Sequence, residues 1–161
     1  MMNILSPLPD HSRVWIYTAN RELTANEVNL MNQKGSAFVQ SWKVHGTPLQ
    51  AGFEIVYNRF IIIAVNENVA GASGCSIDSS VGLMKQFESE FNIVLLDKMN
   101  LGYHGDNNSV EVLSMMEFQN KLDQGGIHSE TIVFNNLVET LGEVRTLWEV
   151  PLKNSWHKQL L

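Results

Sequence analysis

The sequence FIIIAVNENVAGASGCSIDSS (residues 60–80) contains the most apolar run of the chain, then a loop of small residues, then the start of a helix. Its first six residues are all apolar, which predicts a central β-strand covered on both faces. The loop carries Cys75, the single cysteine among 161 residues. From Ile77 onward, apolar residues recur at helical spacing, which predicts an amphipathic helix that ends near Asn92. The rest of the chain is interpreted around this strand, loop and helix.

The composition indicates a folded, acidic, cytoplasmic domain. A hydrophobic content of 44% is enough for a core, and the net charge of −6 without a cluster of Lys and Arg argues against a nucleic-acid partner. A single cysteine excludes an internal disulfide bond. The first residues lack the pattern of a signal peptide, and no apolar run is long enough to cross a bilayer. We therefore expect one cytoplasmic domain without membrane insertion.

The segments before residue 60 have clear local signals. Residues 13–18 alternate in the manner of a strand, with aromatic and β-branched side chains. Thr24 and Glu27 have the spacing of a capping box, which predicts the start of the first helix. Gly35 lies in the apolar stripe of that helix, where its missing side chain favours a close approach to the sheet. Residues 51–57 alternate, and residues 58 and 59 can form a tight turn before the apolar run, so residues 51–65 are expected to form a β-hairpin.

A further apolar run, residues 93–96, predicts a fourth strand and completes the order β-α-β-β-α-β. This order usually builds a ferredoxin-like plait, in which two helices cover one face of four antiparallel strands. We assign residues 1–104 to this α+β unit. Residues 105–161 form a small C-terminal α/β extension, with strands and a capped helix that begins near Ser114. The extension is too short to be stable alone, so we expect it to pack on the first unit.

The loop before the second helix is the main candidate site. Free backbone N–H groups and the positive end of the helix dipole favour anions there, and they would lower the pKa of the Cys75 thiol. The candidate ligand-binding residues are Ser73, Gly74, Cys75, Ser76, Asp78 and Arg13. The same residue types also serve ordinary capping, with Ser73 or Ser76 as the N-cap and Cys75 as packing.

The plait would bring distant residues to this loop, because right-handed crossovers place one end of each strand at the same edge. The side chains expected around Cys75 are those of His11, Arg13, His45, Tyr103 and His104. A cysteine beside a histidine can act as a nucleophile with its base. One cysteine with two or three histidines can instead bind zinc. Loop histidines are commonly solvated surface groups, and we expect neither a metal nor a cofactor.

Two other interpretations fail on their motifs, and one segment has two readings. Residues 71–74 lack the GxxxxGK[ST] frame of a phosphate loop, so the chain has no motif of a P-loop ATPase. The strands lack the RNP1 pattern of an RNA-binding plait. Residues 148–156 have a tryptophan at each end, which is interpreted as core and seam packing or as a partner-facing patch.

Several runs along the chain resemble a family of about this length from Bacteroidota. The most specific is GASGCSIDS at residues 71–79, and the others are RVWIY (13–17), YNRF (57–60), IVFNNLV (132–138) and WEVP (148–151). Members of that family are sometimes labelled ABC transporter ATPases, a label that the missing phosphate loop does not support. The resemblance supplies no catalytic residues that can be carried over to this chain.

These observations favour a cytoplasmic binding or interaction domain without catalytic turnover. Its site would lie at the start of the second helix, and its partner would be a small anion or another protein. The alternative is a cysteine-dependent enzyme or redox protein that uses Cys75 with His45, His11 or His104 as its base.

Overall fold

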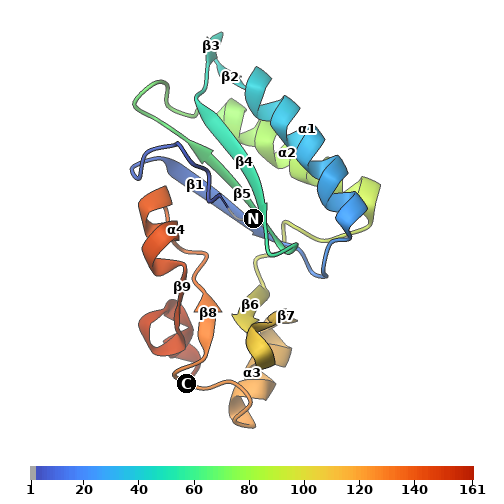
Figure 1. The fold of residues 1–161 in the computed structure, drawn as a ribbon, viewed down its shortest axis with the longest axis vertical. Helices are drawn as coiled ribbons and strands as arrows, with labels where there is room; N and C mark the ends of the chain where they lie inside the picture. The colour runs from blue at the N-terminus through green and yellow to red at the C-terminus, as the bar shows by residue number, and fades with distance from the viewer. Residues whose placement is uncertain (1–2) are drawn as a thin grey trace.

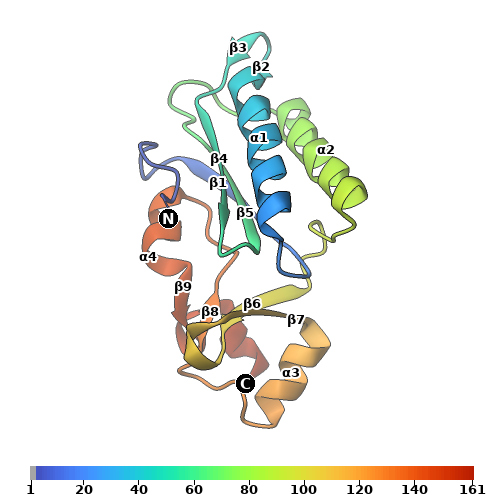
Figure 2. The same ribbon diagram turned by 45° about the vertical axis from the view of Figure 1, so that its right-hand side comes forward.

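A computed structural model describes residues 3–161 and shows a mixed α+β fold with two antiparallel sheets of three or more strands. The first sheet has the strand order β1-β5-β4, and two helices lie side by side on one face of it (Figure 1, Figure 2). A two-stranded hairpin of β2 and β3 projects beyond one end of the sheet. The elements of this part are β1 (Arg13–Thr18), α1 (Ala25–Ser41), β2 (Lys43–Val44), β3 (Thr47–Pro48), β4 (Ala51–Val56), β5 (Phe60–Val65) and α2 (Gly74–Phe91).

The second sheet has the order β7-β6-β8-β9 and lies at the other end of the molecule, together with the C-terminal helices. Residues 100–104, which the sequence places in the first unit, form its strand β6 and pair with β7 and β8. The elements here are β6 (Asn100–His104), β7 (Val110–Ser114), α3 (Met115–Asp123), β8 (Ile132–Phe134), α4 (Leu141–Leu147) and β9 (Glu149–Pro151), with short 3-10 helices η1 (Asp106–Asn108), η2 (Leu152–Asn154) and η3 (Trp156–Leu160). No helix within residues 3–161 has the length and apolar character needed to cross a membrane.

Strand β5 is the centre of the first sheet, as its apolar sequence predicts. It pairs with β1 on one side and β4 on the other, and all six of its residues are buried. Ile61, Ile63 and Val65 contribute to the core beneath α1 and α2. The alternate residues of β5 contribute to a second core, which includes Phe134 and Trp148 from the C-terminal part. The sheet is therefore covered on both faces, which explains why this strand has no polar side.

The fourth strand of the expected plait does not form. Residues 93–96 have no strand conformation, although the first three strands do adopt the order that a plait would have. Ile93 and Leu95 are buried in the core beneath the helices. The backbone amides of Leu95 and Leu96 donate to Glu88 Oε2 of α2, at 2.8 and 3.1 Å. Because a helix carboxylate satisfies these amides, the segment does not need a ladder partner, and the position beside β1 stays open.

The helix boundaries follow the local signals closely. The expected capping boxes at Thr24 and Ser114 are both present, and α2 begins after the N-cap Ser73. It ends at Asn92 in the left-handed conformation, with φ of 51°. A Cβ atom at Gly35 would lie 2.4 Å from the ring of Phe53, so the close approach of α1 to the sheet is confirmed. Helix α4 was missed, because seven residues are too few for a clear periodic pattern.

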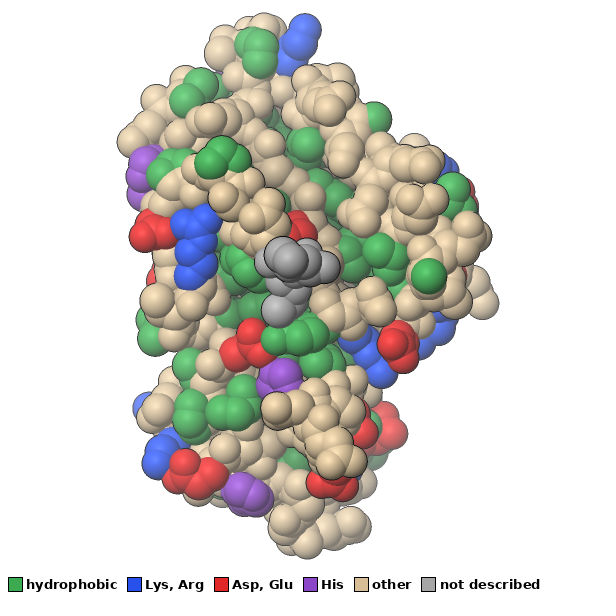
Figure 3. All heavy atoms as spheres, viewed as in Figure 1, with side chains coloured by type: hydrophobic (Ala, Val, Ile, Leu, Met, Phe, Trp, Pro, Cys, Tyr) green, Lys and Arg blue, Asp and Glu red, His purple; other side chains and the backbone are tan. Residues whose placement is uncertain are grey.

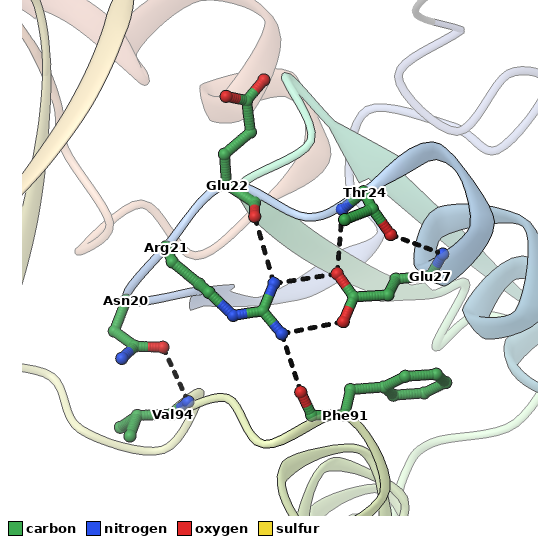
Figure 4. A network of polar contacts seen from close by, with 7 residues as sticks. All are labelled: Asn20, Arg21, Glu22, Thr24, Glu27, Phe91 and Val94. Carbon is green, nitrogen blue, oxygen red and sulfur yellow. Dashed lines mark hydrogen bonds and ion pairs between the residues drawn. The ribbon is translucent and has the colours of Figure 1, made fainter.

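A polar network ties the end of β1 to both helices (Figure 4). Arg21 donates to both carboxylate oxygens of Glu27, at 2.8 and 2.7 Å, and to the carbonyl of Phe91 at the end of α2, at 2.7 Å. The Arg21 guanidinium and the Thr24 amide together lower the pKa of Glu27 to about 2. Asn20 binds Val94 through both its side chain and its backbone amide. The chain that leaves α2 is thereby held against one end of β1.

Candidate functional site

The start of α2 is built as a reciprocal cap. The Ser73 amide donates to Ser76 Oγ at 2.7 Å, and the Ser76 amide donates to Ser73 Oγ at 3.3 Å. Trp42 Nε1 donates to the Ser76 carbonyl at 3.0 Å, which anchors the first turn against the end of α1. Both serine side chains are therefore engaged within the cap. The ordinary capping interpretation accounts for these two residues.

The other candidates of the loop lie at the surface. Cys75 is exposed in the first turn of α2. Gly74 and Asp78 are exposed beside it. Within the described chain, no group of three or more His, Cys, Asp or Glu residues could hold a metal ion.

Two of the expected histidines lie at the same end of the first sheet as this loop. His11 Nε2 is 3.0 Å from Asn66 Oδ1, directly after β5. Arg13, at the start of β1, pairs with Val65 and places its guanidinium 4.7 Å from the ring centre of Trp15. His45 is exposed in the turn between β2 and β3.

His104 lies at the opposite end of the first sheet, so its expected place beside Cys75 is wrong. Its Nε2 is 2.7 Å from Glu149 Oε1, and its ring contacts Tyr57 in the turn between β4 and β5. That turn precedes β5, whereas the Cys75 loop follows β5, and a strand of six residues separates the two by roughly 17 Å. The error has one cause: β6 joins the second sheet instead of continuing the first.

Tyr57, His104 and Glu149 form a polar contact between the two sheets. The Tyr57 hydroxyl donates to Glu149 Oε1 at 2.9 Å, the same oxygen that contacts His104. Burial and the Glu149 carboxylate raise the pKa of Tyr57 to about 12, so its hydroxyl stays protonated. The Tyr57 ring also packs edge-on against Phe134 of β8. These contacts fasten the β4–β5 turn to the C-terminal sheet.

A pocket of about 440 Å³ extends along the outer edge of β1, where the fourth strand was expected. Pockets that hold small molecules typically measure about 300–1,000 Å³. Its other walls come from α2, from the chain that follows α2 together with β6, from β8 and the segment after it, and from η3. The lining residues outside β1 are Ile77, Val81, Leu95, Leu96, Asp97, Lys98, Asn100, Leu101, Gly102, Phe134, Asn136, Leu137, Val138 and Trp156.

The backbone of β1 presents unpaired groups to this pocket. The Val14 amide donates to the Glu139 carbonyl at 3.0 Å, and the Asn20 amide donates to the Val94 carbonyl at 3.1 Å, both on the side away from β5. Backbone groups alternate in direction along an antiparallel strand, so Ile16 and Thr18 face the same side. Among residues 3–161, no hydrogen bond outside the strand ladders involves the amides of Ile16 and Thr18, and the alternation directs them away from β5. In the part of the chain that the structure describes, the edge of β1 thus lacks hydrogen-bond partners between Val14 and Asn20, whose amides are bonded to other segments of the chain.

Sequence patterns do not reveal this pocket, because its walls come from five separate parts of the chain. The one local signal is the polar pair Asp97 and Lys98 directly after the apolar run, which marks where the chain turns away from the sheet. Figure 3 shows that Lys and Arg side chains on the face of Figure 1 are scattered, and several lie beside acidic groups.

The chain matches no protein-family model, and comparison with curated proteins and with solved structures gives no match.

Proposed function

We propose that this chain is a cytoplasmic, non-catalytic binding domain, and that its ligand occupies the pocket beside β1. The observation that carries the proposal is an unpaired strand edge that lines an otherwise mostly apolar pocket. Most ligand sites combine apolar walls, which supply affinity, with a few polar groups that orient the ligand. Both components are present here.

The walls supply apolar contact on two opposite sides. Ile77 and Val81 project from α2, while Phe134, Leu137 and Val138 come from the C-terminal part. Leu137 is 68% exposed, which is high for a large apolar side chain. A ligand that covers it would remove this surface from water, and burial of apolar area favours binding.

The start of α2 supports a binding role less well than the pocket does. Its two serines are occupied by the reciprocal cap. A polar anion site there would depend on Gly74, Asp78 and the exposed thiol alone. We therefore place the ligand along β1.

The test fills the pocket and measures binding of an apolar probe. Trp15 and Trp156 line the pocket, so a brominated decanoate that enters it should quench tryptophan fluorescence saturably. Val81→Phe places a ring in the pocket and should weaken this binding at least about tenfold, because the probe loses its apolar contacts. Ser79→Phe is the matched control, since Ser79 is exposed on the same helix and does not line the pocket.

Two further variants keep the result interpretable. Leu137→Glu places a carboxylate at an exposed lining position and should also weaken binding, without burying a charge in the core. Cys75→Ser should leave binding unchanged, because the thiol lies outside the pocket lining. Near-UV circular dichroism establishes that each variant is folded. The proposal is wrong if the probe binds the folded Val81→Phe and Leu137→Glu variants with wild-type affinity.

A further inference from the structure

We infer that the pocket binds a short, extended, peptide-like ligand with apolar side chains, which pairs with Ile16 and Thr18 as a strand of two or three residues. This inference rests on the proposed function and names the class of its ligand. It combines three observations: the place of the pocket in the sheet, the length of the open edge, and the direction of the unpaired backbone groups.

The pocket occupies the place of a missing strand. The first sheet has the order β1-β5-β4, and β1 is its edge beside the pocket. The chain itself supplies hydrogen bonds at both ends of this edge, from Glu139 opposite Val14 and from Val94 opposite Asn20. The segments between Val94 and Glu139 do not pair with β1, and parts of them line the pocket instead. A ligand strand would therefore complete a row of backbone hydrogen bonds that the chain itself forms only at the two ends of β1.

The closed ends limit the length of the ligand. Six residue steps separate Val14 from Asn20, which corresponds to roughly 20 Å of extended strand. The bonds at these two residues occupy the outer positions, so the backbone groups left for a ligand are those of Ile16 and of Thr18, a residue that is only 4% exposed. Two or three extended residues, roughly 7–10 Å long, fit this interval. A long peptide that adds a full edge strand would collide with the segments at Val94 and Glu139.

The open groups match a peptide backbone and not a plain hydrocarbon. Ile16 directs both its N–H and its C=O to the pocket, and Thr18 repeats this pair two residues later. In an antiparallel pair, one residue of the partner exchanges both bonds with its opposite residue. A three-residue ligand can therefore form such pairs with Ile16 and Thr18 at once. A fatty acyl chain would fill the volume but cover these groups without satisfying them, which costs affinity.

The walls determine which side chains the ligand carries. Successive residues of a strand point to opposite faces, so one ligand side chain would point toward Ile77 and Val81 of α2. The next would point toward Phe134 and Val138 on the other side. Apolar walls on both faces favour apolar side chains at consecutive positions, as in strands that are buried on both faces.

The experiment compares a peptide with its ester analogues. The probes are N-acetyl-Leu-Val-Leu-amide, two analogues in which an ester oxygen replaces a different backbone N–H, and decanoate. An ester cannot donate a hydrogen bond, so at least one analogue should bind roughly three- to tenfold more weakly than the peptide. In spectra of 15N-labelled protein, the peptide should shift the Ile16 and Thr18 amide signals and slow their hydrogen exchange, whereas decanoate should not slow that exchange.

A pair of protein variants tests the same bond from the other side. Proline is tolerated on an edge strand where its N–H would face outward, so Ile16→Pro removes the donor. Ile16→Ala removes the same side chain but keeps the donor, and it is the matched control. Peptide affinity should fall at least about threefold further in Ile16→Pro than in Ile16→Ala, while decanoate should bind the two variants equally. Circular dichroism establishes that both variants are folded.

The outcomes separate this inference from the proposed function. The inference is overturned if the peptide and both esters bind equally and the Ile16 amide exchange is unchanged. In that result, binding of brominated decanoate that Val81→Phe weakens would still support the binding function. If neither the peptide nor the fatty acid binds the wild type, both proposals are wrong.

Discussion

Acid should weaken this fold through one buried histidine, His157 of η3. The residue has 0% solvent exposure, and its ring stacks on Trp156 with centres 4.0 Å apart and contacts Phe118. Nδ1 lies 2.7 Å from Ser155 Oγ, whereas Nε2 has no hydrogen-bond partner among the described residues. Burial of the ring lowers its pKa from 6.5 to about 4, because a protonated imidazole would lose its hydration here.

The size of the effect follows from proton linkage. In the unfolded chain His157 takes up a proton below pH 6.5, while in the folded protein it stays neutral down to about pH 4. The unfolded state therefore binds more protons between these values, and the free energy of unfolding falls as the pH falls. At pH 7.5 the contribution is near zero. At pH 5.0 it amounts to a loss of roughly 2 kcal/mol, and the full loss below pH 4 approaches roughly 3 kcal/mol.

Urea unfolding at pH 7.5 and at pH 5.0 measures this loss, with His157→Phe as the reference that cannot titrate. Other groups titrate in both proteins, so the difference between their pH dependences isolates His157. The wild type should lose roughly 2 kcal/mol more than the variant over this interval. Equal losses in the two proteins, with both folded at pH 7.5, would refute the reasoning that His157 is neutral because it is buried.

Two further predictions concern the first sheet and its helices. Gly35→Ala should lower the free energy of unfolding by roughly 1–3 kcal/mol, because the added Cβ atom would overlap the Phe53 ring. Thermal unfolding measures this loss, with Ser36→Ala at an exposed site as the control. An unchanged midpoint would contradict the close packing of α1. Arg21→Gln should lower the free energy of unfolding at pH 7 by roughly 1 kcal/mol, as measured with urea. It should also return the pKa of Glu27 from about 2 toward its ordinary value, so the variant should lose less stability than the wild type between pH 4.5 and pH 2. An unchanged Glu27 titration by NMR would refute the role of the ion pair.

Local signals in the chain predicted the elements that depend on near neighbours. The capping boxes at Thr24 and Ser114 use bonds between residues three apart, so their sequence pattern is sufficient to locate them. The six apolar residues of β5 predicted a central strand because no amphipathic alternative fits an all-apolar run. Gly35 predicted a close approach, since a glycine within an apolar helical stripe is otherwise unfavourable.

Residues 93–96 show where local signals stop being informative. Their apolar run has the composition of a buried strand, and the core does bury Ile93 and Leu95. Whether such a run joins a sheet depends on which acceptor its backbone amides bond, and here the acceptor is the Glu88 carboxylate of α2. This acceptor belongs to another element, so a sequence pattern of neighbouring residues does not predict it.

The position of His104 and the pocket along β1 both follow from that single choice. Once the chain leaves the sheet after Val94, β6 starts a second sheet and carries His104 away from Cys75. The same departure leaves Ile16 and Thr18 unpaired at the edge. Helix caps and buried strands could be located because their energies come from residues close together along the chain. The site could not, because hydrogen bonds between distant segments create it, and only packing brings those segments together.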